Sequence, residues 1–170
     1  MRKGYTARQT GRIWVMAGSM LLSPWLATAE NMTFHGTLVE YPPCEINGGE
    51  PVEIDFGEVG VNKVDGQNYA QTFTITYDCE GLSTDMVLRY KGVVTTFDTA
   101  AVQSNIADFG IQLQHQKGGV ITPFAVGTSI PIPSYLGGST FVATPVKKVG
   151  ADLSEAGAFT SAATLQLEYQ

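Results

Sequence analysis

Three features of the sequence predict an all-β chain folded as an antiparallel β-sandwich. Hydrophobic and polar residues alternate with a period of two over several short runs, which is typical of half-buried strands. Turn-forming glycine, asparagine and aspartate residues separate these runs at frequent intervals. Helical periodicity is limited to one short candidate helix near residues 100–105. A closed β-barrel is the competing architecture for the same pattern.

The first 29 residues are predicted to be a secretory signal peptide. Four basic residues precede an apolar run at 13–26, and the small residues 27–29 follow it as a cleavage site. The apolar run is too short for a helix that spans the membrane, and no later segment is apolar enough. We therefore expect an exported chain that starts at Glu30 and forms one domain without membrane insertion.

The charge balance narrows the range of partners. Four of the ten Lys and Arg residues lie in the predicted signal peptide, so six remain against sixteen Asp and Glu, a formal charge of −10. A surface with this charge repels nucleic acid backbones and anionic lipid headgroups. We therefore expect neither nucleic acid nor a membrane as a partner.

Cys44 and Cys79 are the two cysteines of the chain, and both belong to the exported part. An oxidising compartment lets a disulfide persist, and two cysteines allow a single pairing. Closing a loop of this length stabilises a fold by roughly 3 to 4 kcal/mol. His35 and His115 are scattered and give no zinc-like spacing with the cysteines, so we expect no metal and no cofactor.

The strands predicted after Cys44 are one fewer than a complete immunoglobulin-type sandwich needs. Such a sandwich has seven strands. The alternation predicts six, at residues 52–56, 71–79, 86–91, 109–115, 140–147 and 159–169. The sequence therefore predicts an incomplete immunoglobulin-like β-sandwich that lacks its last strand.

The N-terminal segment is predicted to be a separate extended strand. Alternate positions carry its apolar face, which consists of Met32, Phe34, Gly36 and Leu38. Pro42 and Pro43 end this strand before Cys44, because proline supplies no backbone donor. We therefore divide the exported chain into an extension, residues 30–43, and a body, residues 44–170.

The C-terminal end shows the same alternation over a longer stretch. Gly157 is fourteenth from the C-terminus, and Tyr169 is next to last. The residues predicted to share one face between them are Phe159, Ser161, Ala163, Leu165, Leu167 and Tyr169.

These two ends together resemble pilins assembled by the chaperone-usher pathway. The penultimate tyrosine, the glycine fourteenth from the end and the alternating apolar residues between them are similar to the C-terminal signature of that family. The front resembles it too, with a signal peptide, a short extension with a central glycine, and Pro-Pro-Cys. Residues 41–44 (Tyr-Pro-Pro-Cys) and 54–57 (Ile-Asp-Phe-Gly) are most similar to minor tip and adaptor subunits of P-type pili.

The resemblance implies a structural protein of the cell-surface fimbrium, reached through the periplasm. A periplasmic pilus chaperone would fill the groove left by the missing strand, and at the outer-membrane usher a neighbouring pilin subunit would replace it by donor-strand exchange. The implied donor residues are Met32, Phe34, Gly36 and Leu38. The implied pairing residues, whose strand binds first the chaperone and then the donor, are Gly157, Phe159, Ala163, Leu165, Leu167, Tyr169 and Gln170. The terminal carboxylate of Gln170 would be held by basic residues of the chaperone.

Two alternative functions are a self-complete binding domain and an enzyme. The N-terminal segment could be the first strand of a self-complete sandwich, which would suit a secreted lectin or adhesin domain that binds host carbohydrate. An enzyme would need a catalytic constellation, and the sequence has no Gly-x-Ser-x-Gly elbow, Walker-type loop or His-Glu-x-x-His motif. A glycosidase pair is defined by distance in space rather than by sequence. We expect no enzyme.

Overall fold

The computed structural model describes residues 32–38, 40, 44–79, 86–132, 136–153 and 157–169. The chain divides into two units, Met1–Leu38 and Val39–Gln170, and each is described by itself. The predicted signal peptide, the Pro42-Pro43 joint and Gln170 lie outside the described residues and stay predictions. So does the division of the exported chain into extension and body.

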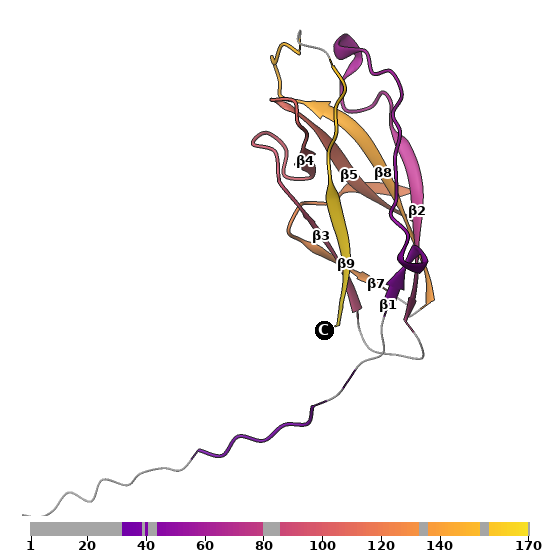
Figure 1. Ribbon diagram of the computed structural model, residues 1–170, viewed down its shortest axis with the longest axis vertical. Coiled ribbons are helices and arrows are strands. Elements are labelled where there is room, and N and C mark those ends of the chain that lie inside the picture. The colour runs from indigo at the N-terminus through magenta and orange to yellow at the C-terminus, as the bar shows by residue number, and fades with distance from the viewer. Residues whose placement is uncertain are drawn as a thin grey trace, which may run out of the picture. The chain divides into compact units, whose positions relative to one another are not determined.

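The body consists of two antiparallel sheets (Figure 1). The order in the larger sheet is β1 (Cys44–Ile46), β2 (Gln71–Cys79), β8 (Leu136–Lys147), β5 (Phe109–Lys117) and β4 (Ala101–Gln103), and β6 (Val120–Pro123) pairs with the end of β5. The order in the smaller sheet is β7 (Ser129–Ile132), β3 (Met86–Gly92) and β9 (Ala163–Tyr169). Two short 3₁₀ turns, η1 (Asn47–Gly49) and η2 (Val61–Lys63), lie between β1 and β2. The predicted all-β sandwich is confirmed, and the closed barrel is not.

The main hydrophobic core lies between these sheets. Strand β2 shows how the sequence builds it, because Ile75, Tyr77 and Cys79 are buried while Thr76 and Asp78 between them are exposed. Phe141 of β8 and Leu88 of β3 are fully buried from opposite sheets. A second, smaller core at one end gathers around the buried residues Val64, Phe109 and Leu153.

The structure corrects two of the predicted elements. Residues 52–56 form no strand, although they alternate as predicted, because they share no hydrogen-bonded ladder with any described strand. The helix expected near residues 100–105 is wrong, because Ala101–Gln103 is strand β4. Its residues pair with Gly110–Gln112 of β5, and this tertiary pairing outweighs the weak local helical preference. Gly110 allows the close approach, since a Cβ atom there would lie 2.5 Å from the Val102 carbonyl oxygen.

Candidate functional site: a groove along the open side of the sandwich

A groove of about 1130 Å³ runs along the side of the body where the two sheets do not meet. Its first rim is the segment 44–56, indigo in Figure 1, and its second rim is the side of β9, yellow, where residues 159–165 line the groove. Core side chains from both sheets form its floor. These floor residues are Ile75, Tyr90, Val102, Leu113 and Ala143. The groove therefore opens directly onto the hydrophobic core.

The first rim starts as a strand and continues without a ladder. Strand β1 is the last strand of the larger sheet and pairs with β2 as far as Ile46. Further along, Ile54 and Phe56 are half-buried against the core while Glu53 and Asp55 are exposed. This rim therefore places its side chains as a strand does, with apolar ones inward and acidic ones outward.

The second rim is the edge strand of the smaller sheet. Strand β9 pairs with β3 along its whole length, from Ala163 opposite Gly92 to Tyr169 opposite Met86. No described strand pairs with its other edge. Leu165, Leu167 and Tyr169 pack against the core, so these residues share one face as predicted. The row of backbone groups along the groove is a ready template for another strand.

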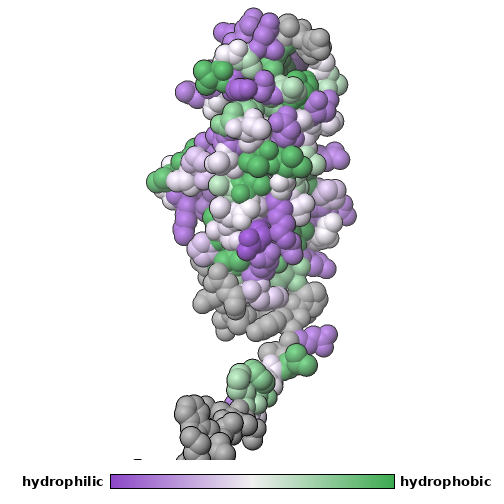
Figure 2. Space-filling model, turned by 90° about the vertical axis from the view of Figure 1, so that its left-hand side faces the viewer, coloured by the Kyte–Doolittle hydropathy of each residue, from purple (hydrophilic) through white to green (hydrophobic). Residues whose placement is uncertain are grey.

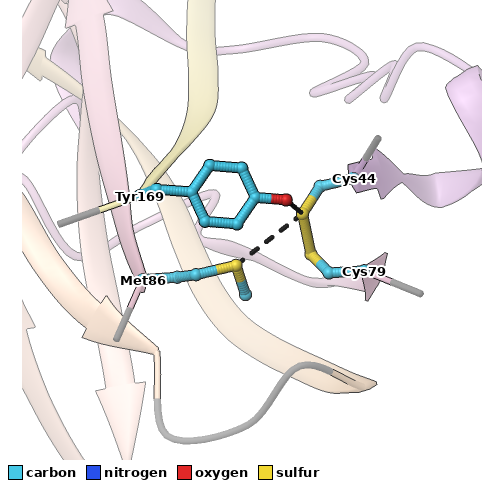
Figure 3. Close-up of a disulfide and its surroundings, with 4 residues drawn as sticks. All are labelled: Cys44, Cys79, Met86 and Tyr169. Carbon is cyan, nitrogen blue, oxygen red and sulfur yellow. Dashed lines mark hydrogen bonds between the residues drawn. A yellow bond between two sulfur atoms is a disulfide. The ribbon is translucent and has the colours of Figure 1, made fainter. Parts of the chain in front are cut away.

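The disulfide lies at one end of the groove and brings the two rims together (Figure 3). Cys44 and Cys79 are bonded, as predicted, and join β1 to β2. The Tyr169 hydroxyl, which comes from the other rim, donates a hydrogen bond to the Cys44 sulfur at 2.8 Å. The Met86 sulfur lies 3.7 Å from the same atom. The penultimate tyrosine thus fastens the end of β9 to the disulfide.

Aromatic side chains close the opposite end. The rings of Phe56 and Phe159, one from each side of the groove, have centroids 6.1 Å apart. Phe159 also meets Phe109 edge to face at 4.9 Å, so it belongs to the smaller core. Gly157 lies in an apolar cavity of about 40 Å³ beside that core. The stretch 157–162 makes a single bridge and no ladder, so the predicted strand at 159–169 starts later, at Ala163.

Two titratable groups near the groove have shifted pKa values. Hydrogen bonding to the Arg89 guanidinium, at 2.7 Å, lowers the pKa of the Glu168 carboxyl on β9, and Lys91 at 3.5 Å adds to this. Burial, with the nearby Asp98 carboxylate, raises the pKa of Tyr90 in the floor far above its usual value. The Tyr90 phenol therefore stays neutral, as its position beside the Phe124 ring and among the floor residues requires.

Outside the groove, the described part of the body has only scattered exposed hydrophobic residues. The large hydrophobic residues exposed elsewhere on the body lie in short stretches at 93–94, 120–121 and 149. Figure 2 shows one side of the molecule, where hydrophobic residues occur in separate places among hydrophilic ones. Within the described residues, no three His, Cys, Asp or Glu side chains are placed to hold a metal ion, and no helix is long and apolar enough to cross a membrane.

The N-terminal unit is described over residues 32–38. This segment is neither helix nor strand. The side chains of Met32, Phe34 and Leu38 are 76, 84 and 102% exposed, and a Cβ atom at Gly36 would have no neighbour within 4 Å. Three large apolar side chains at alternate positions are thus available to a partner, and their role as a donor strand stays a prediction.

Comparison with known proteins identifies the family. The sequence model of the family described as fimbrial protein matches residues 32–170. The chain belongs to the fimbrial protein family. This match includes residues 32–43 of the predicted extension and both rims of the groove.

Two relatives illustrate how much of the fimbrial chain is shared. It is 34% identical to the fimbrial-like protein YfcQ of Escherichia coli strain K12 over 151 residues, which is 85% of this chain and 90% of YfcQ. It is 26% identical to the fimbrial adapter PapF of Escherichia coli over 140 residues, which is 77% of this chain and 83% of PapF.

Solved structures agree with this assignment. The P pilus adaptor subunit PapF superimposes with a TM-score of 0.60 at 26% identity, over 77% of this chain and 98% of that one. The P pilus rod subunit PapA gives a TM-score of 0.54 at 21% identity, over 75% and 99%, and shows the shared fold. The predictions of a chaperone-usher pilin with an immunoglobulin-like fold, located in a surface fimbrium, are confirmed.

The sequence revealed the rims of the groove but not its floor. The inward faces of β9 and of residues 52–56 follow from their alternation. Tyr90, Val102 and Ala143 were not singled out, although they lie in the floor. Tyr90 and Ala143 belong to strands that alternation predicted, whereas Val102 belongs to the stretch that was predicted as a helix. Alternation does not reveal which strands flank the missing one.

Proposed function

We propose that this fimbrial subunit polymerises by donor-strand exchange, with a strand from another chain filling the groove. The observation that carries the proposal is the groove itself, which opens onto the core between two sheet edges. A strand laid there would hydrogen-bond to the free edge of β9 and place alternate side chains against the floor. It would supply the strand that the sandwich lacks.

The exposed segment 32–38 is the matching donor in this proposal. Its apolar side chains at positions 32, 34 and 38 would enter the groove of a neighbouring subunit, and Gly36 would meet a narrow place in it. Strand β9 and the residues around it, from Gly157 to Gln170, would be the pairing partner. The chain would thus bind one neighbour through its groove and another through its extension.

A periplasmic chaperone and an outer-membrane usher complete the proposed pathway. An open groove exposes the core and an unpaired edge, which makes a free subunit prone to aggregation. The signal peptide at residues 1–29 would direct export, and a chaperone strand would then cover the groove. At the usher, the donor strand of another subunit would replace the chaperone strand. The protein would perform no catalysis and would need no cofactor.

A position as a minor tip or adaptor subunit that supports cell adhesion is part of the proposal. Its support is the similarity to the adaptor PapF in both sequence and structure. An adaptor needs a groove for one neighbour and an extension for another, and this chain offers a candidate for each.

The deciding experiment is export of the full chain to the periplasm with and without a pilus chaperone. We expect a soluble one-to-one complex with the chaperone, and aggregation or degradation without it. A stable, soluble monomer without the chaperone would overturn the proposal in favour of the self-complete lectin or adhesin domain. Phe34→Asp serves as the second arm, since it should leave the chaperone complex intact and block incorporation into fibres. Normal incorporation would disprove the donor assignment.

A further inference from the structure

The two rims of the groove differ in their charge. All charged residues that line the groove are acidic, and all of them belong to the first rim: Glu45, Glu50, Glu53 and Asp55. Their side chains are exposed. No Lys, Arg or His is found among the described residues that line the groove. A strand in the groove would therefore lie next to a row of negative charge on one side.

These carboxylates have no cation partner among the described residues. On β9, Glu168 has its own cations, Arg89 at 2.7 Å and Lys91 at 3.5 Å. The four acidic residues of the first rim form no ion pair with any described residue. Asp55 accepts a hydrogen bond from the backbone N–H of Gly57, which leaves its charge in place.

The register between β1 and β2 adds to the negative charge. Glu45 lies directly opposite Asp78, and both side chains are exposed. Like charges directly opposite each other in a ladder repel, whereas an opposite charge on the next strand attracts. A cation brought to the other side of Glu45 would relieve this repulsion.

The geometry of a strand fixes where that cation would be. Glu53 and Asp55 alternate with the inward-facing Ile54 and Phe56, so they point outward. An added strand likewise turns one row of side chains to the floor and the other to solvent. The outward row would lie roughly 5 Å from the carboxylate row, measured between Cβ atoms of opposed residues.

We propose that the groove selects a strand of a different protein chain whose solvent-facing side chains include lysine or arginine. This inference rests on the proposed donor-strand function and specifies which strand is preferred. A second copy of this chain is the weaker occupant, because the residues between its donor positions are Thr33, His35 and Thr37, which carry no permanent positive charge.

The test uses three synthetic peptides that share the apolar row of residues 31–40. One is the natural extension, one has Lys at positions 33, 35 and 37, and one has Glu there. Each is added while the full chain is refolded, and its Kd is measured by fluorescence anisotropy at low and high salt. We expect the Lys peptide to bind about tenfold more tightly than the Glu peptide at low salt, with the natural peptide between them. The ratio should shrink at high salt.

Charge variants of the protein assign the effect to the rim. The double variant Glu45→Gln/Glu53→Gln removes two of the four rim carboxylates and should clearly reduce the ratio, while Glu58→Gln, an exposed carboxylate outside the groove lining, should leave it unchanged. Equal binding of the three peptides, a natural peptide that matches the Lys peptide, or a ratio that survives the double variant overturns this inference and leaves donor-strand binding intact. Failure of all three peptides to bind overturns both.

Discussion

The two rims of the groove have the same alternating sequence pattern and different structures. In β9, hydrophobic residues face the core and the backbone is paired with β3 over seven residues. In residues 50–56, Ile54 and Phe56 also face the core, yet no ladder forms with any described strand. One rim has a partner strand on one side, and the other pairs with no described strand after Ile46.

This difference separates two properties that alternation is often taken to predict together: the direction of the side chains and the formation of a hydrogen-bonded ladder. Alternation determines which side chains turn to the core, and both rims follow it. A ladder also needs a neighbouring backbone at the right distance, which a segment cannot supply for itself. Under the proposed function, residues 50–56 are a strand whose partner comes from another chain.

The largest effect on the rims is expected from removal of the disulfide. The double variant Cys44→Ser/Cys79→Ser removes the covalent link between the start of the first rim and β2, and with it the sulfur that Tyr169 of β9 contacts. The cysteines are 35 residues apart, and opening a loop of that size should lower the free energy of unfolding by roughly 3 to 4 kcal/mol. Urea denaturation measures this loss of unfolding free energy, with the groove saturated by a peptide of the extension. An unchanged midpoint would mean that the first rim is held in place by packing alone.

A smaller effect should come from trimming one apolar side chain on each rim. Leu165→Ala on β9 should cost about 2 kcal/mol without an occupant, and Ile54→Ala about 1 kcal/mol, because Ile54 lacks a ladder to hold it against the core. With an extension peptide bound, the two losses should converge. Val149→Ala, at a side chain that is 99% exposed, is the control for a neutral truncation. If the two variants still lose different amounts of unfolding free energy with the peptide bound, the idea that an occupant completes the first rim is contradicted.

Tyr169→Phe tests the contact that joins the rims at the disulfide. Loss of the hydroxyl removes its 2.8 Å hydrogen bond to the Cys44 sulfur and should cost about 1 kcal/mol of unfolding free energy. In the Cys44→Ser/Cys79→Ser background the cost should change, since a serine hydroxyl replaces the disulfide sulfur as acceptor, and a double-mutant cycle measures the coupling. Strict additivity would show that the hydroxyl and the disulfide act independently.

The smallest effect concerns the charges on β9. Hydrogen bonding and attraction to Arg89 and Lys91 lower the pKa of Glu168 in the folded state. The stabilisation is therefore present above the unfolded-state carboxyl pKa and is lost as the pH falls through the lowered folded-state pKa. The wild type should lose stability relative to Glu168→Gln as the pH falls below about 5, with Glu58→Gln as the control for loss of a surface charge. Parallel pH profiles of wild type and Glu168→Gln would contradict this.

The sequence predicted the long strands of the fold and missed the short ones. Strands β2, β3, β5, β8 and β9 have enough alternating residues to be recognised, with boundaries that shift by a few positions. Strands β4 and β7 have three and four residues, and their existence depends on pairing with β5 and β3. A local pattern of that length does not distinguish a strand from a helical turn, which explains the error at residues 100–105.

For the site, residues near the chain ends could be predicted and residues in the floor could not. Tyr169, Leu167 and Leu165 stand in one long alternating run, and the single cysteine pair leaves no choice of partner. Tyr90 and Val102 come from different sheets, and only the packing of those sheets brings them to the same groove. Phe159 keeps the predicted parity but joins the smaller core.

The contacts at the two ends of the groove limit how a strand can be inserted. At one end Tyr169 reaches the Cys44 sulfur across the opening, and at the other Phe56 and Phe159 face each other. Under the proposed function, a strand that enters from the open side of the groove avoids both contacts. A segment that is still attached to a folded domain at one end can enter in this way without passing a free terminus through the subunit.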